Sequence, residues 1–191
     1  MISEPIAVTL RVIDALDALG VPCLIGGSLA SALHGVPRAT ADADLVADLR
    51  FEHASSLADA LASEFYVDAD AIREAIRHQR SFNVIHLASA FKVDIFVRKK
   101  RAFDNAQFAR RAKQIVATDP ERTAFVASAE DSILAKLEWY RIGGEVSDRQ
   151  WRDVIGILKT QSERIDRDYM LKMANELGVV DLLERALKEA A

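Results

Sequence analysis

Two aspartates stand two residues apart, at Asp42 and Asp44, in a segment whose residue types alternate. The alternation over 42–49 predicts a β-strand, and side chains two positions apart on a strand project from the same face. Two carboxylates held so close repel each other, which a fold tolerates best when a cation lies between them. Mg²⁺ or Mn²⁺, bound by carboxylates, water and substrate phosphates, suits such a pair. The alternative is an acidic strand edge that faces solvent.

A third carboxylate, Asp94, lies inside the apolar segment FKVDIFV at 91–97. The segment predicts a strand with Val93, Ile95 and Val97 on one face and Lys92, Asp94 and Phe96 on the other. A carboxylate among so many apolar residues is unusual because a lone buried charge is costly. The alternative is the polar outer face of an antiparallel strand. Residues 81–87 predict a neighbouring strand, joined to 91–97 by a short hairpin link.

Gly26, Gly27 and Ser28 separate a short apolar strand at 21–25 from a short helix at 28–34. Glycines let a backbone approach a ligand closely, and the following helix directs free N–H groups and its positive dipole end toward the loop. This arrangement is typical of a phosphate site, with the Ser28 hydroxyl as an additional donor. The alternative is an ordinary glycine turn with Ser28 as the helix cap.

The elements that must position these residues alternate between helix and strand. Helices are expected after Pro5, over 51–65 and over 103–113, and short strands over 114–118 and 124–127. The SAED segment at 128–131 predicts a capped helix that ends near Gly143, with further helices to residue 188. The pattern indicates an α/β fold, a mixed β-sheet flanked by helices. We expect two domains, an α/β core over 1–127 and a helical region over 128–191 packed on that core.

The overall composition is that of a globular protein without a strong affinity for nucleic acid. The formal net charge of the 191 residues is −4, although a basic run at 98–101 could guide a polynucleotide or simply be a solvated surface. Cys23 cannot form an internal disulfide. The N-terminus lacks the pattern of a signal peptide and no stretch is long and apolar enough for a membrane span, so we expect a cytoplasmic protein.

Taken together, the motifs resemble the polymerase-β-like nucleotidyltransferase superfamily. The subgroup they resemble most is that of the AbiEii-like and MenT-like toxin–antitoxin and abortive-infection nucleotidyltransferases. The motifs that carry the resemblance are GGS at 26–28, PRATADADL at 37–45, KVDIF at 92–96, SAEDSILAK at 128–136 and DRQWRD at 148–153. They occur in the family's order, and the similarity extends over about residues 24–158.

The resemblance implies a nucleotidyltransferase fold and transfer of a nucleoside monophosphate from an NTP to an acceptor hydroxyl. By this resemblance, Asp42, Asp44 and Asp94 bind Mg²⁺ or Mn²⁺, and Asp94 helps to activate the acceptor. The same resemblance assigns nucleotide binding to a second group of residues, namely Gly26, Gly27, Ser28, Arg38, Lys136 and Asp153. Arg38 and Lys136 also have simple interpretations as a surface arginine and a solvated helix lysine.

The acceptor is left open by the sequence. An RNA end (tRNA in particular), a protein hydroxyl or a small molecule would fit the same chemistry, and the family suggests a cognate toxin or antitoxin partner. An alternative class is a catalytically silent nucleotide-binding or partner-binding module with the same fold. A further alternative is an unrelated α/β domain in which GGS and DAD occur by coincidence.

Overall fold

The computed structural model describes residues 3–35, 37 and 39–191 and divides them into two compact units. Unit 1 comprises residues 3–25, 40–99 and 112–126, and unit 2 the described residues of 26–39 together with 100–111 and 127–191. The chain therefore passes between the units several times, whereas the sequence suggests one boundary after residue 127.

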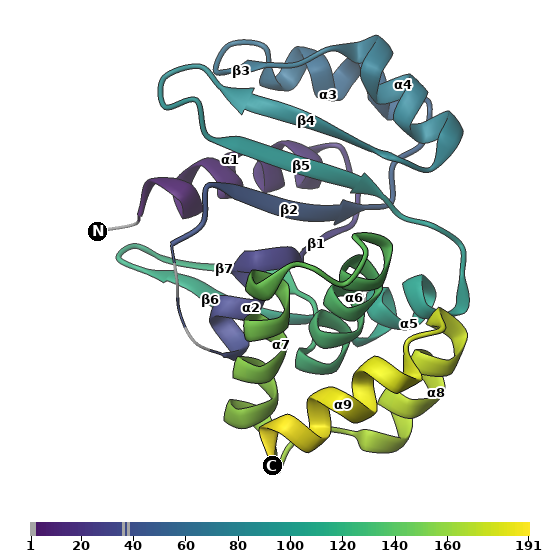
Figure 1. The fold of residues 1–191 in the computed structure, drawn as a ribbon. Helices are drawn as coiled ribbons and strands as arrows, with labels where there is room; N and C mark the ends of the chain where they lie inside the picture. Colours follow the sequence, from purple (N-terminus) through teal and green to yellow (C-terminus); the bar gives the residue numbers. More distant parts are fainter. Residues whose placement is uncertain (1–2, 36, 38) are drawn as a thin grey trace. The chain divides into compact units, whose positions relative to one another are not determined.

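Unit 1 is built around a mixed sheet of seven strands in the order β3-β4-β5-β2-β1-β7-β6 (Figure 1). The strands are β1 (Cys23–Ile25), β2 (Asp42–Ala47), β3 (Phe65–Tyr66), β4 (Ser81–His86), β5 (Lys92–Val97), β6 (Ala112–Thr118) and β7 (Glu121–Val126). The pairs β2–β5 and β1–β7 are parallel and the other neighbours are antiparallel. The predicted α/β fold with a mixed sheet is confirmed.

Three helices accompany this sheet: α1 (Glu4–Ala18), α3 (His53–Leu61) and α4 (Ala69–His78). Helix α1 packs against β1, β2 and α3, while α4 packs against β4 and α3. Buried residues of β2 and β5 alternate with half-buried ones, so one face of these strands is buried and the other is partly accessible. The buried face is entirely apolar, and the charged residues of both strands stand on the partly accessible face.

Unit 2 is helical in its described residues. Its helices are α2 (Gly27–His34), α5 (Ala102–Arg110), α6 (Ala129–Ile142), α7 (Asp148–Gln161), α8 (Arg167–Leu177) and α9 (Val180–Ala190). Helix α6 begins as predicted, because the Ser128 hydroxyl accepts a hydrogen bond from the Asp131 N–H at 3.1 Å. Leu134, Leu137, Val154, Ile157 and Leu183 are at most 3% exposed and form the centre of its core.

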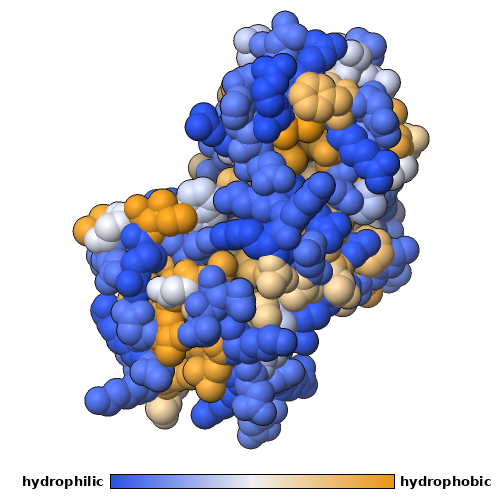
Figure 2. Space-filling view, turned by 90° about the vertical axis from the view of Figure 1, so that its right-hand side faces the viewer, coloured by the Kyte–Doolittle hydropathy of each residue, from blue (hydrophilic) through white to orange (hydrophobic). Residues whose placement is uncertain are grey.

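No helix among the described residues is both long and apolar enough to cross a membrane. The face drawn in Figure 2 is largely hydrophilic, with hydrophobic side chains in separate patches.

A buried polar cluster ties three helices of unit 2 together. The Asp131 side chain is fully buried and accepts hydrogen bonds from the Tyr169 hydroxyl at 2.5 Å and the Ser128 hydroxyl at 2.9 Å. Arg110 lies over the Tyr169 ring at 3.9 Å and pairs with Glu130 at 3.2 Å. Burial raises the pKa of Asp131, against the lowering effect of the two hydroxyls and of Arg110.

We therefore expect Tyr169→Phe to destabilise the fold by about 1–3 kcal/mol, because it removes a donor from a fully buried carboxyl group. The hydroxyl stabilises the ionised carboxylate, so the loss should be larger at pH 8 than at pH 4. Urea unfolding at both pH values measures it. Tyr66→Phe, at a side chain 64% exposed, is the control and should leave stability unchanged. A Tyr169→Phe variant with equal losses at both pH values would exclude an ionised Asp131 as the acceptor.

Candidate active site

The three predicted metal-binding aspartates lie in unit 1 on one face of two neighbouring strands. Parallel pairing of β2 with β5 places Asp44 directly opposite Asp94, and Asp42 opposite Lys92. All three carboxylates belong to the half-buried face, while Ala43, Leu45 and their β5 counterparts turn to the buried face. We refer to Asp42, Asp44 and Asp94 as the carboxylate row. The fold thus brings Asp94 onto the same surface as Asp42 and Asp44, from which it is far removed in the sequence.

Asp42 is held in place by Thr40, which lies just before β2. The Thr40 hydroxyl donates a hydrogen bond to the Asp42 carbonyl oxygen at 2.8 Å and lies 3.2 Å from Oδ1 of the same residue. Such a local bond fixes the backbone where the chain enters β2.

One ammonium group accompanies the carboxylate row. Nζ of Lys92 lies 2.7 Å from Oδ2 of Asp94. The hydrogen bond to Asp94 is the largest influence on Lys92 and raises its pKa, and the negative charges of Asp94, Asp42 and Asp44 act in the same direction against desolvation. The half-buried face therefore attracts positive charge. The sequence places Lys92 on the same face as Asp94 but gives no sign of this role, because the pairing of β5 with β2 decides it.

The oxygen atoms of the carboxylate row are suitable ligands for a hard divalent cation. Carboxylate oxygens are the protein ligands that Mg²⁺ and Mn²⁺ prefer, and the face already stabilises one cation. Among the described residues, however, no three His, Cys, Asp or Glu side chains are gathered closely enough to hold a metal ion. Asp94 is instead bound to Lys92. The donor types of the three residues therefore fit a metal, whereas their arrangement in this structure does not gather them around one, and Asp94 is engaged by Lys92.

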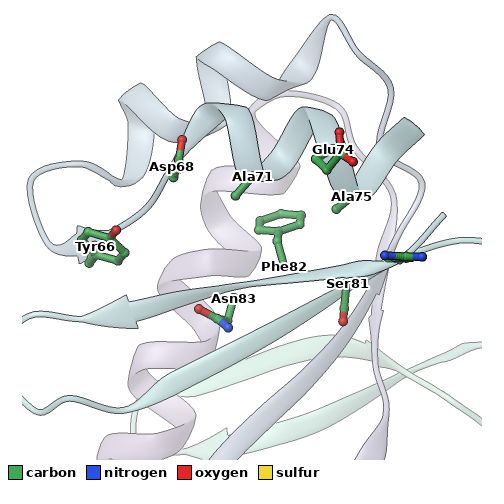
Figure 3. A pocket seen from close by; sticks show the side chains of 9 residues that line it. Tyr66, Asp68, Ala71, Glu74, Ala75, Ser81, Phe82 and Asn83 are labelled. Atoms are coloured by element: carbon green, nitrogen blue, oxygen red, sulfur yellow. The ribbon is translucent and has the colours of Figure 1, made fainter. Parts of the chain in front are cut away.

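A polar residue that sequence reasoning missed extends the carboxylate row onto β4. Antiparallel pairing places Asn83 opposite Asp94, on an exposed position of β4. Asn83 also lines a pocket of about 370 Å³ between α4 and β4, together with Tyr66, Asp68, Glu74, Arg80 and others (Figure 3). No residue predicted for the site lines this pocket. Only the strand register connects Asn83 with Asp94, so the sequence alone offered no signal for it.

The predicted phosphate-binding residues belong to unit 2. Helix α2 begins at Gly27, close to the predicted start, with Gly26 as an extended N-cap residue. Gly27 has φ +53°, in the left-handed region that favours glycine. Ser28 stands in the first turn of the helix, where backbone N–H groups lack partners within the helix. Arg38, assigned to the nucleotide by family resemblance, lies outside the described residues.

Lys136 and Asp153, the remaining predicted residues, meet inside unit 2. Nζ of Lys136 on α6 lies 2.8 Å from Oδ2 of Asp153 on α7, and both side chains are only 9% exposed. The interpretation of Lys136 as a solvated helix lysine therefore does not describe this structure. The predicted site residues fall into two groups, with the carboxylate row in unit 1 and Gly26, Gly27, Ser28, Lys136 and Asp153 in unit 2.

No protein-family model matches the chain, and a search of curated proteins finds no match. Solved structures do match over nearly the whole chain. An antigenic nucleotidyltransferase-like protein from Paracoccidioides brasiliensis has a TM-score of 0.57 at 18% identity, covering 98% of this chain and 94% of that one.

The antibiotic-resistance factor ANT(2'')-Ia is also similar. Its structure in complex with adenylyl-2''-tobramycin gives a TM-score of 0.57 at 13% identity, covering 92% of this chain and 97% of the other. Its solution structure gives 0.52 at 14% identity, covering 100% and 96%. At these identities the similarity establishes the fold, which is the nucleotidyltransferase fold expected from the sequence. It does not identify the AbiEii-like or MenT-like subgroup.

Proposed function

We propose that this chain transfers a nucleoside monophosphate from an NTP to an acceptor hydroxyl. The observation that carries the proposal is the carboxylate row, in which Asp44 and Asp94 are register partners on one half-buried face and Asp42 stands two residues from Asp44. The nucleotidyltransferase fold supports the same reaction class.

In the proposed reaction, the acceptor oxygen attacks the α-phosphorus in line. A bond forms between that oxygen and the α-phosphorus, the bond from the α-phosphorus to the β-phosphate oxygen breaks, and pyrophosphate leaves. Asp94 takes the hydroxyl proton, and Asp42 and Asp44 supply anionic oxygen ligands. A bound Mg²⁺ or Mn²⁺ would neutralise the charge of the triphosphate. The backbone N–H groups at Gly27 and Ser28 and the ammonium of Lys136 are the groups in unit 2 suited to phosphate.

The test is an incubation with each of the four α-³²P-labelled NTPs, Mg²⁺, and total cellular RNA and protein. We expect label from one or more NTPs to reach an acceptor with wild-type protein and not with Asp42→Asn/Asp44→Asn. The labelled fraction identifies the acceptor class. RNA or protein labelling would agree with the toxin–antitoxin or phage-defence role suggested by sequence. Absence of label from both would direct the test to small hydroxyl compounds, such as the tobramycin of the adenylyl-2''-tobramycin complex of ANT(2'')-Ia.

One observation favours a second candidate, a catalytically silent nucleotide-binding module. In this structure Asp94 is paired with Lys92, and the described residues contain no gathered metal cluster. A silent module would gain thermal stability from an NTP with Mg²⁺ and yet transfer no label to any acceptor. Label transfer by wild-type protein excludes it.

A further inference from the structure

We propose that Lys92 is a tethered cation that occupies the carboxylate row in the metal-free protein and competes with a divalent metal ion for Asp94. This inference rests on the proposed function, because it concerns the metal that the same carboxylates would bind. It goes further in assigning to the chain its own competitor for that metal.

The position of Lys92 among the acids follows from strand geometry. It stands opposite Asp42 on the parallel neighbour strand and two residues before Asp94 on its own strand, so all three side chains leave the same face. Its ammonium lies 2.7 Å from Oδ2 of Asp94 and is attracted by Asp42 and Asp44 as well. Lys92 is the one cationic residue in the described strands β2 (Asp42–Ala47) and β5 (Lys92–Val97).

The relative burial of the two partners suits a displaceable contact. The Asp94 side chain is 19% exposed, whereas that of Lys92 is 41% exposed. Lysine carries its charge on a flexible four-carbon stem, so the ammonium can leave Asp94 without any change in the strand backbone. The backbone that carries Asp94, by contrast, is fixed by the pairing of β5 with both β2 and β4, and the Asp94 side chain is shorter and more buried.

Removing the Lys92 ammonium should have different effects on the metal-free protein and on metal binding. Without metal, the ammonium offsets the repulsion among the carboxylates, so its removal should lower thermal stability. With metal, the ammonium must leave Asp94 and repels the incoming ion, so its removal should tighten binding. A lysine with a purely structural role would produce the first effect and not the second.

The experiment measures Mn²⁺ binding in the absence of nucleotide, by the electron paramagnetic resonance signal of free Mn²⁺. We expect Lys92→Met to bind Mn²⁺ about tenfold more tightly than wild type, since repulsion between a unit charge and a divalent ion a few ångströms away is of that order in water. Lys92→Arg keeps the charge and should bind no more tightly than wild type. Lys99→Met, an exposed lysine beyond the end of β5 in the same unit, controls for the change in net charge.

Mn²⁺ affinity that is equal in wild type and Lys92→Met, or undetectable in both, overturns the tethered-cation proposal. So does an equal gain in Lys99→Met. Label transfer by the same wild-type preparation separates this failure from failure of the proposed function. Tighter binding by Lys92→Met without any label transfer would support the tethered cation and count against the enzyme.

Discussion

Asp44→Asn is expected to lower the rate of nucleotidyl transfer by at least about 100-fold while leaving the metal-free protein as stable as wild type or more stable. The loss follows because Asp44 is the register partner of Asp94, and an amide cannot supply the negative charge that a divalent cation and the transition state require. Stability is retained because asparagine has nearly the same shape and can keep hydrogen bonds, and because the reduced repulsion among the carboxylates offsets the lost attraction between Asp44 and Lys92.

Initial rates of label transfer and thermal unfolding without metal measure the two effects together. Asp59→Asn is the matched control, since Asp59 is an exposed aspartate of α3 in the same unit, and its activity and stability should equal those of wild type. An Asp44→Asn protein that keeps more than half of the wild-type rate would remove the carboxylate row from the chemistry. Lost activity accompanied by lost stability would instead indicate misfolding as the cause.

Local sequence pattern was sufficient to locate the strands that carry the carboxylate row. Alternating residue types predicted a strand over 42–49, and an apolar segment with one wholly apolar face predicted another over 91–97. The structure has β2 at Asp42–Ala47 and β5 at Lys92–Val97. Alternation works here because one face of each strand is buried, which imposes a period of two on the side chains. The capped start of α6 was equally local, since one serine hydroxyl and one backbone N–H define it.

Features that depend on tertiary pairing could not be predicted in the same way. The helix predicted over 51–65 ends at Leu61, because Phe65 and Tyr66 pair with β4 as the short strand β3. The helix expected to reach Lys113 ends at Arg110, because residues from Ala112 onward pair with β7. In both places hydrogen bonding to a distant strand overrides local helical preference.

The same limit applies to the candidate site. That Asp44 faces Asp94, and that Lys92 faces Asp42, is a property of the register between β2 and β5. A shift of one residue would turn one whole set of side chains to the opposite face. The sequence therefore predicted the members of the carboxylate row, whereas the lysine among them and the neighbouring Asn83 emerged only from the strand pairing.

The largest expected effect on stability belongs to Lys136→Met, at about 3–5 kcal/mol of unfolding free energy. Both side chains of the Lys136–Asp153 pair are 9% exposed and their charged atoms are 2.8 Å apart. Removing the ammonium takes from the buried Asp153 carboxylate a cation 2.8 Å away that offsets part of its desolvation. Urea unfolding at neutral pH measures the loss.

A double variant tests whether the uncompensated charge is the cause. Lys136→Met/Asp153→Leu removes both charges and should recover much of the stability lost in the single variant, because apolar side chains of similar size can replace a buried ion pair. Asp181→Asn serves as the control. Asp181 pairs with Arg141, which lies on the same helix as Lys136. The Asp181 side chain is 71% exposed, so loss of its charge should have no measurable effect on stability. A double variant no more stable than Lys136→Met would show that lost packing, not charge, explains the change.

The double variant also separates folding from nucleotide binding. Family resemblance assigns Lys136 to the triphosphate, whereas the structure gives it a partner within unit 2. The same resemblance assigns Asp153 to the nucleotide. If both residues serve stability alone, the double variant should bind NTP with Mg²⁺ like wild type.

A lysine that neutralises phosphate, by contrast, cannot be replaced by methionine in any background. We follow the resemblance and expect the double variant to be folded yet to show no stabilisation by NTP and Mg²⁺. Wild-type NTP-dependent stabilisation in that variant would assign both Lys136 and Asp153 to the fold alone.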